Sequence, residues 1–116
     1  MEETQLTGKV ILIGNESLGA PDRDLGMLLM GNFLRILGER ASLPSYIILW
    51  NTGALLAVEG SGTVDHLRKL QERGVKVICC RTCAEYFGIE DKLGVGQIDG
   101  MVGILELLST SQVITV

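Results

Sequence analysis

The sequence predicts an α/β domain of three layers, in which helices cover both faces of a mainly parallel sheet. Short apolar segments rich in β-branched residues alternate with longer segments whose apolar residues recur at helical spacing. The chain has 116 residues, 47% of them hydrophobic and 21% charged, which is the size and composition of one globular domain. We therefore assign residues 1–116 to a single domain.

Four segments have the length and composition of strands that are buried on both faces. The first ends in Gly14, and the second follows Pro44 and leads into turn-forming residues. The third follows a glycine directly and ends in two cysteines, and the fourth closes the chain. The predicted strands cover residues 9–14, 46–50, 75–80 and 112–116.

Helices are predicted between these strands. Asp24 is expected to cap a helix over 24–40, whose apolar positions are Leu25, Leu28, Leu29, Phe33, Ile36 and Leu37. Because further apolar residues widen this stripe, we expect the helix to be deeply buried or packed against another subunit. Helices over 63–73 and 82–87 end at Gly74 and Gly88, and a last helix over 99–108 begins with Asp99 as its cap.

The carboxyl edge of the predicted sheet is where chemistry is expected. In parallel sheets ligands bind at the carboxyl ends of the strands, beside a switch in strand order. Three segments of this chain lie there, namely residues 14–23, 51–62 and 79–88.

The segment Cys80-Arg81-Thr82-Cys83 places two thiols three positions apart, where a buried strand meets a helical turn. The first amides of the helix and the Arg81 cation are expected to lower the thiol pKa and favour the reactive thiolate. Cys80 is then the nucleophile, and Cys83 resolves it as a disulfide or receives a transferred sulfur atom. Cys79 points to the other side of the strand and is expected in the core. The alternative is that all three cysteines are inert core residues.

The other candidate residues give weaker signals. Arg81, Asn51, Thr52 and Ser17 are candidate pocket-lining residues, although turn formation accounts equally well for the polar ones. His66 has no partner at helical spacing, so no metal site is expected. The glycines match no phosphate-binding motif, and no cofactor is expected.

Composition excludes several classes of function. The net charge of −4, the isoelectric point near 4.9 and the 4% aromatic content argue against nucleic-acid binding. The apolar runs are too short to span a membrane, and no signal peptide is recognisable. Three cysteines within five positions indicate a reducing, cytoplasmic setting rather than a disulfide framework.

The chain resembles the DsrE-like family of small sulfur-handling proteins, and within it a branch associated with selenium metabolism. The resemblance covers nearly the whole chain and rests on an ordered set of short motifs. These are Gly19 with Asp24-Leu25-Gly26 and Gly31-Asn32-Phe33, Leu43-Pro44 before Ile48-Leu49-Trp50-Asn51-Thr52-Gly53, Cys80-Arg81-Thr82-Cys83 with Tyr86 and Gly88, and Val95-Gly96-Gln97-Ile98 with Met101.

The resemblance implies a mainly parallel five-stranded sheet, a homo-oligomer and a persulfide carried on Cys80, whose spacing to Gly88 matches the family. Cys83 is similar to a second cysteine of the branch. Three positions depart from the branch: Arg81 replaces a glycine, Gly19-Ala20-Pro21 replaces a more glycine-rich loop, and Gly100 stands where an asparagine is common. The branch often adds a TusA-like domain, for which 116 residues leave no room. Sulfur donor and acceptor are therefore expected to be separate proteins, possibly TusA-like, unless the chain is a fragment.

The leading hypothesis is a sulfur or selenium relay, a sulfurtransferase-like carrier with Cys80 and Cys83 as its catalytic residues. One alternative is a thiol-disulfide redox module in which the two cysteines cycle as a pair. The other is a regulatory or binding domain without chemistry at the cysteines. The sequence does not distinguish sulfur from selenium or identify the partners.

Overall fold

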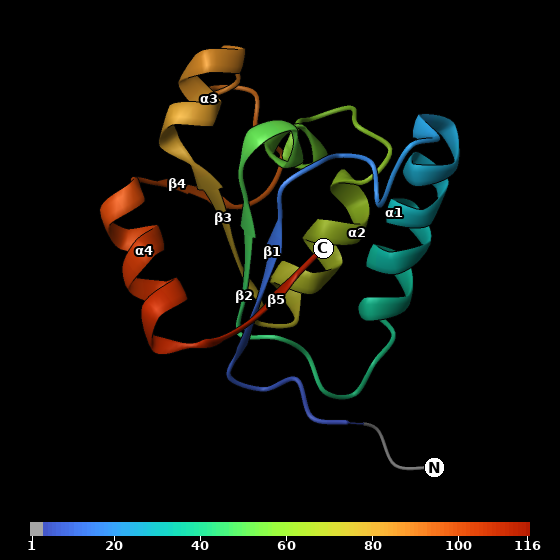
Figure 1. Ribbon diagram of the computed structural model, residues 1–116, viewed down its shortest axis with the longest axis vertical. Helices are drawn as coiled ribbons and strands as arrows, with labels where there is room; N and C mark the ends of the chain where they lie inside the picture. Colours follow the sequence, from blue (N-terminus) through green and yellow to red (C-terminus); the bar gives the residue numbers. More distant parts are fainter. Residues whose placement is uncertain (1–3) are drawn as a thin grey trace.

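The computed structural model describes residues 4–116 as alternating strands and helices around one sheet (Figure 1). The strands are β1 (Lys9–Ile13), β2 (Tyr46–Leu49), β3 (Lys76–Cys80), β4 (Gln97–Asp99) and β5 (Gln112–Thr115). The α-helices are α1 (Arg23–Leu37), α2 (Val64–Glu72), α3 (Arg81–Phe87) and α4 (Met101–Thr110), and η1 (Asn51–Ala57) is a 3₁₀ helix.

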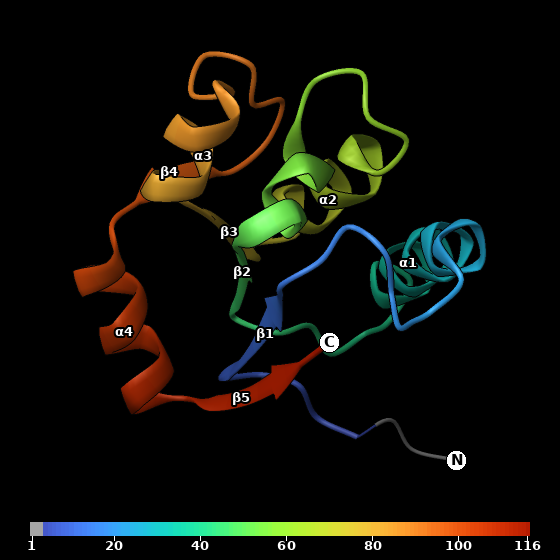
Figure 2. The ribbon, with the colours of Figure 1, turned by 45° about the horizontal axis from the view of Figure 1, so that its top comes forward.

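All strand pairs are parallel, in the order β4-β3-β2-β1-β5. The first three connections step across the sheet in one direction, and the connection through α4 returns the chain to the far side of β1. Because crossover connections are right-handed, this reversal places α4 on the face opposite α1 and α2, as Figures 1 and 2 show. The predicted three-layer α/β architecture with a parallel five-stranded sheet is therefore confirmed.

Each face of the sheet has its own apolar core. The face toward α1 and α2 buries alternate strand residues against both helices, namely Ile11, Ile13, Ile47, Leu49 and Val77 against Met30, Leu34, Leu67 and Leu70. The opposite face packs the intervening residues against α4, namely Val10, Leu12, Ile48, Ile78 and Cys80 against Ile104. Alternation along the strands thus decides which side of the sheet each cysteine faces.

The caps of two helices differ from the prediction. Asp22, in extended conformation, caps α1 by accepting a 2.9 Å hydrogen bond from the Leu25 N–H, so Asp24 lies inside the first turn. The helix ends at Leu37, three residues earlier than predicted, because the chain turns at Gly38. Asp99 belongs to β4 and accepts a bond from the Gly100 N–H, and Gly100 is the N-cap of α4.

The apolar surface of α1 also differs from the prediction. Its buried residues are Gly26, Met30, Leu34 and Leu37, whereas Leu25, Leu28 and Ile36 are each more than half exposed. Most of the predicted apolar stripe therefore faces outward. The contact with the sheet is made by residues beside that stripe, Met30 and Leu34. Deep burial of this helix is excluded, while packing against another subunit stays a prediction.

The sequence analysis missed two elements. Strand β4 has only three residues and no apolar run, and η1 occupies a segment in which only a turn was predicted. None of the helices within residues 4–116 has both the length and the hydropathy needed to cross a membrane.

Candidate functional site

The two cysteines of the predicted motif lie at the junction of β3 and α3. Cys80 is the last residue of β3, and α3 begins at Arg81, so Cys83 lies in the first turn of the helix. Cys80 packs on the α4 side of the sheet. Cys79 instead packs among Ala54, Ala84 and Ile89, in the opposite direction, as the strand alternation predicts.

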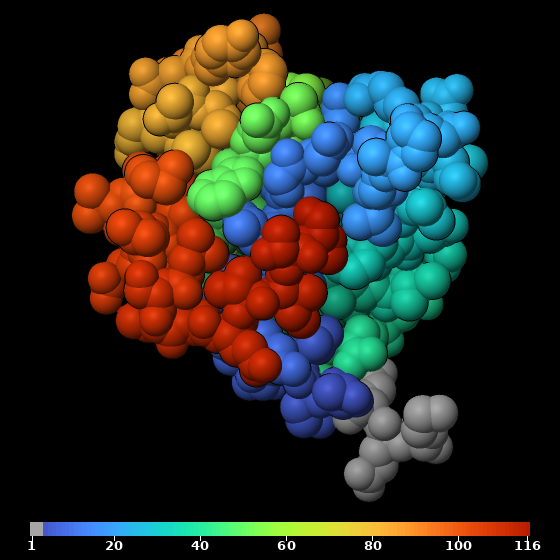
Figure 3. All heavy atoms as spheres, in the orientation of Figure 1, coloured from blue at the N-terminus to red at the C-terminus, as the bar shows by residue number. Residues whose placement is uncertain are grey.

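The register of the sheet brings the end of β2 to the same place. Leu49 pairs with Cys79, so the residues that follow β2 lie beside the start of α3. Figure 3 shows the green atoms of the junction between β2 and η1 lying between the orange α3 and the red-orange α4. Strand pairing alone therefore brings Trp50 and Asn51 next to the cysteines.

Two neighbouring hollows flank Cys83. One has a volume of about 380 Å³ and is lined by Trp50, Asn51, Cys80, Thr82, Cys83 and Met101. The other has a volume of about 340 Å³ and is lined by Asn51, Thr82, Cys83, Tyr86 and Phe87. We call the first the cysteine hollow and the second the aromatic hollow. All three cysteines are free; Cys80 is 2% exposed and Cys79 fully buried, whereas Cys83 is partly exposed.

Asn51 supplies a hydrogen bond to this site through its backbone. Its N–H donates to Cys83 Sγ over 3.0 Å, and its side-chain Oδ1 accepts a bond from the Thr52 N–H over 2.7 Å. Among residues 4–116 Asn51 is the non-glycine residue with a positive φ, 53°. Asparagine tolerates this left-handed conformation better than most residues.

The electrostatic environment of the thiols differs from the prediction. Burial raises the pKa of Cys79 to about 11. Burial also raises the pKa of Cys83, and the hydrogen bond from Asn51 offsets only part of this effect, while a hydrogen bond with the Cys80 side chain raises it further. Burial of Cys83 therefore disfavours its thiolate. Among residues 4–116, no cationic side chain lines either hollow to offset this effect.

The other predicted pocket residues lie outside both hollows. Arg81 is exposed on α3, and the partly buried Thr52 accepts a bond from the Glu16 N–H. Ser17 is buried against Gly26, where an added Cβ would lie 1.7 Å from the Ser17 hydroxyl oxygen. Of the four weaker candidates, only Asn51 lines the hollows with the two cysteines. His66 is partly exposed on α2, and within residues 4–116 no three metal-binding side chains are grouped to hold an ion.

Sequence reasoning missed Trp50, Met101, Tyr86 and Phe87 as lining residues. Trp50 was assigned to a strand, although it directly precedes Asn51 and follows from the same parallel pairing. Met101 was predicted within the last helix, but its place beside the cysteines depends on the pairing of β4 with β3, and β4 was not predicted. Tyr86 and Phe87 belong to the short predicted helix and form an edge-to-face pair with ring centroids 5.2 Å apart.

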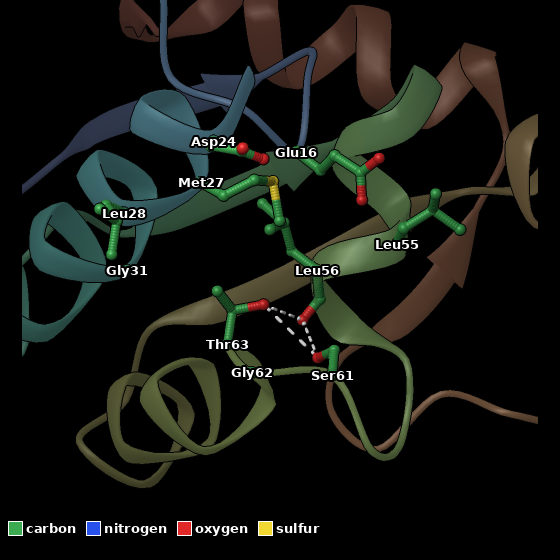
Figure 4. A pocket seen from close by; sticks show the side chains of 10 residues that line it. All are labelled: Glu16, Asp24, Met27, Leu28, Gly31, Leu55, Leu56, Ser61, Gly62 and Thr63. Atoms are coloured by element: carbon green, nitrogen blue, oxygen red, sulfur yellow. Dashed lines mark hydrogen bonds between the residues drawn. The ribbon is translucent and has the colours of Figure 1, made fainter. Parts of the chain in front are cut away.

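A third hollow, shown in Figure 4, lies at the carboxyl end of β1 between α1 and the segment that leads from η1 to α2. Its volume is about 440 Å³. We call it the acidic hollow; it is lined by Glu16, Asp24, Met27, Leu28, Gly31, Leu55, Leu56, Ser61, Gly62 and Thr63. Glu16 pairs with Arg23 at 2.6 Å, and the hydroxyls of Ser61 and Thr63 both donate to the Leu56 carbonyl. These polar groups are thus engaged within the fold.

Comparison with solved structures supports the fold. The chain resembles the YchN protein of E. coli, with a TM-score of 0.69 and 21% identity over 97% of this chain and 100% of that one. MTH1491, a protein of unknown function from Methanobacterium thermoautotrophicum, aligns with a TM-score of 0.66 and 18% identity over 93% of this chain and 97% of that one. BT1422 from Bacteroides thetaiotaomicron, also of unknown function, aligns with a TM-score of 0.64 and 17% identity over 94% of this chain and 95% of that one. At these identities the likeness shows the fold alone.

Comparison of the sequence with protein families gives a more specific result. No curated protein matches the chain. The model of the DsrE/DsrF-like family matches residues 45–116, a range that includes β2, both site cysteines and Asn51. The chain therefore belongs to the DsrE/DsrF-like family.

Proposed function

We propose that this protein is a sulfur relay protein that carries a persulfide on Cys80 and exchanges it with partner proteins. Its family is associated with sulfur relay. The observation that carries the proposal is that two free thiols, Cys80 and Cys83, line one hollow at the carboxyl end of β3. The apolar side chains of Trp50 and Met101 line the same hollow and limit access of water to a reactive persulfide.

The transfer is a thiol exchange without net oxidation. A thiolate attacks the outer sulfur of a donor persulfide, a new sulfur–sulfur bond forms, and the donor leaves as a thiolate. The same step in reverse passes the outer sulfur to the thiolate of an acceptor. Only thiols of this chain and of its partners change bonding, so the reaction needs no organic cofactor.

The proposal includes the kinds of partner. Sulfur donor and acceptor are separate proteins that work in the cytoplasm, with TusA-like proteins as the candidates, and a selenium donor is chemically equivalent. The chain assembles with copies of itself through α1, whose outward face exposes Leu25, Leu28, Leu29 and Ile36. Light scattering should give a mass above one chain for the wild type and a lower mass for Leu28→Glu. A monomeric wild type would contradict this assembly.

Persulfide loading tests the proposed chemistry. We expect incubation with a persulfide donor to add the mass of one sulfur atom to the intact chain, and peptide mapping to find it mainly on Cys80. Passage of sulfur to an acceptor thiol should fall strongly in Cys80→Ser and persist in Cys79→Ala, a matched control because Cys79 faces away from the cysteine hollow. Absence of sulfur on Cys80 of the wild type, or undiminished passage of sulfur by Cys80→Ser, would exclude the relay.

A thiol-disulfide module is the second candidate, because the free thiols of Cys80 and Cys83 line the same hollow. It predicts reversible loss of two hydrogens without sulfur uptake. Oxidised protein should then retain one alkylatable thiol, that of Cys79, after unfolding. Retention of all three thiols would exclude the disulfide, and the slow alkylation of a buried thiol would favour an inert binding domain.

A further inference from the structure

We propose that Cys83 is the thiol that first accepts sulfur from a partner, and that Asn51 positions it by directing a backbone N–H at its sulfur. This inference rests on the proposed relay and adds to it the order of the two cysteines and a positioning residue outside the CxxC motif.

The exposure of the two thiols gives their order. Cys80 is 2% exposed and lines only the cysteine hollow, whereas Cys83 is partly exposed and lines both hollows. The aromatic hollow extends from Cys83 to Tyr86, whose surface is 83% exposed. A persulfide on a partner protein that enters from this side meets Cys83 before Cys80.

Asn51 provides what an attacking thiol at this position needs. The reactive form of Cys83 is the anion, and burial disfavours that anion. Among residues 4–116, no cationic side chain lines either hollow to compensate. The Asn51 N–H, 3.0 Å from the sulfur, is the donor that stabilises the negative charge.

The direction of this N–H depends on the backbone conformation of Asn51. Its φ of 53° turns the chain out of β2 and into η1, with the Oδ1 bond to the Thr52 N–H inside the turn. A residue that avoids positive φ will rotate this peptide and move the donor away from Cys83. The choice of residue at position 51 therefore controls the chemistry of a side chain 32 positions away.

Two balanced steps follow. The Cys83 thiolate attacks the outer sulfur of the donor persulfide, and the donor leaves as a thiolate. The Cys80 sulfur then attacks the outer sulfur of the Cys83 persulfide, the sulfur–sulfur bond to Cys83 breaks, and the Cys80 proton passes to the Cys83 thiolate. One sulfur atom has moved, and the second step regenerates the Cys83 thiol.

The first test measures the thiol without sulfur chemistry. The substitutions Cys79→Ala and Cys80→Ser leave Cys83 as the reacting cysteine. In this background, the rate of alkylation by iodoacetamide is measured against pH for three chains, with asparagine, glycine or valine at position 51. Glycine accepts a positive φ, whereas β-branched valine disfavours it. Asn51→Gly should keep the titration midpoint, and Asn51→Val should raise it and lower the rate near neutral pH about tenfold.

Thr52→Val is the matched control, because it introduces the same side chain next to Asn51 but outside both hollows. It should leave the alkylation profile unchanged. Circular dichroism verifies folding, and Asn51→Ala replaces Asn51→Val if the latter does not fold. Equal profiles for the glycine variant and the folded β-branched or alanine variant would overturn the role of Asn51.

The second test measures the order of transfer in the full chain. Rapid quenching after addition of a persulfide donor should find sulfur on Cys83 before Cys80, and Cys83→Ser should slow the loading of Cys80 about tenfold or more. If Cys80 loads equally fast without Cys83, the inferred order is wrong while the relay stands. If neither cysteine loads, the relay itself fails, whatever the alkylation profiles show.

Discussion

The acidic hollow and the cysteine hollow both lie at the carboxyl edge of the sheet, but the polar groups that line them have different kinds of bonding partner. In the acidic hollow, Glu16 is paired with Arg23, and Ser61 and Thr63 are both bound to one carbonyl. In the cysteine hollow, Cys83 Sγ accepts a hydrogen bond from the backbone N–H of Asn51, which is held at a positive φ. The polar groups of the larger hollow therefore stabilise loops, while the smaller hollow brings two free thiols together.

The two regions also differ in the space around their glycines. Gly53 lies in η1, two residues after Asn51 of the cysteine hollow, and Gly62 lines the acidic hollow. A Cβ at Gly53 would lie 2.3 Å from the Ile13 carbonyl oxygen, whereas a Cβ at Gly62 would meet nothing within 4 Å. The chain around the cysteines is thus fixed by a close backbone contact with β1.

The largest effect on stability is expected for Gly53→Ala. The new methyl group must displace η1 from β1, which should lower the free energy of unfolding by about 3 kcal/mol, at the upper end of overpacking effects. Gly62→Ala should change it by about +0.5 kcal/mol or less, because the methyl group enters open space and restricts the unfolded chain. Urea unfolding measures both.

The same pair of variants sharpens the comparison chemically. Because displacement of η1 moves Asn51, Gly53→Ala should also slow alkylation of Cys83 near neutral pH, and Gly62→Ala should not. Equal stabilities for the two variants would show that the contact between η1 and β1 does not fix the cysteine side of the edge.

The second prediction concerns pH and the buried Cys79. Its pKa of about 11 lies above that of an unfolded thiol, so the folded state holds the proton more tightly. The resulting stability is complete below the unfolded pKa of about 8.5 and is lost as the pH rises through the folded pKa. We expect a loss of about 3 kcal/mol between these limits.

Cys79→Ala identifies the residue responsible. The variant should be less stable than the wild type near pH 7, because it leaves a small cavity, but its unfolding free energy should decline less at high pH. Urea unfolding from pH 7 to 11 measures both chains. Parallel curves would show that Cys79 does not lose its proton on unfolding, and that another group controls the alkaline limit.

The central strands were predictable because burial on both faces requires short apolar runs rich in β-branched residues. The helices were predictable because their apolar residues recur at helical spacing. The caps were harder, since Asp22 and Asp24 both precede the apolar stripe of α1, and only the backbone conformation distinguishes them. Strand β4 was not recognised because its three residues carry no apolar run; its place is set by pairing with β3.

In the candidate site, too, the features carried by the local sequence were predictable and those set by strand pairing were not. Cys80 and Cys83 were found because their spacing and their place after a buried strand carry chemical information. The left-handed backbone of Asn51 and its bond to Cys83 depend on the register of β2 and β3, which one sequence does not contain. The raised pKa of Cys83 was not predictable either, because it depends on how deeply the folded chain buries this thiol.

The third prediction tests the corrected cap at the edge of the acidic hollow. Asp22→Ala removes the acceptor of the Leu25 N–H and should cost about 1 kcal/mol of stability. Asp24→Ala removes a carboxylate from the first turn, where its interaction with the helix dipole is worth about 0.3–1 kcal/mol. Thermal unfolding of the two variants gives the order; a larger loss for Asp24→Ala would restore the cap that the sequence predicts.

The smallest effect on stability is expected for Glu16→Gln. This variant tests whether a charge in the acidic hollow affects the cysteines. The ion pair with Arg23 is open to solvent on the arginine side, so its loss should cost about 0.5 kcal/mol. Glu16 is linked to η1 through its backbone N–H, which donates to Thr52 Oγ1 and is retained in the variant. Persulfide loading of Cys80 should therefore stay at the wild-type rate, measured by intact mass. Slower loading with unchanged stability would mean that the Glu16 charge acts on the cysteines, and the acidic hollow would then belong to the site.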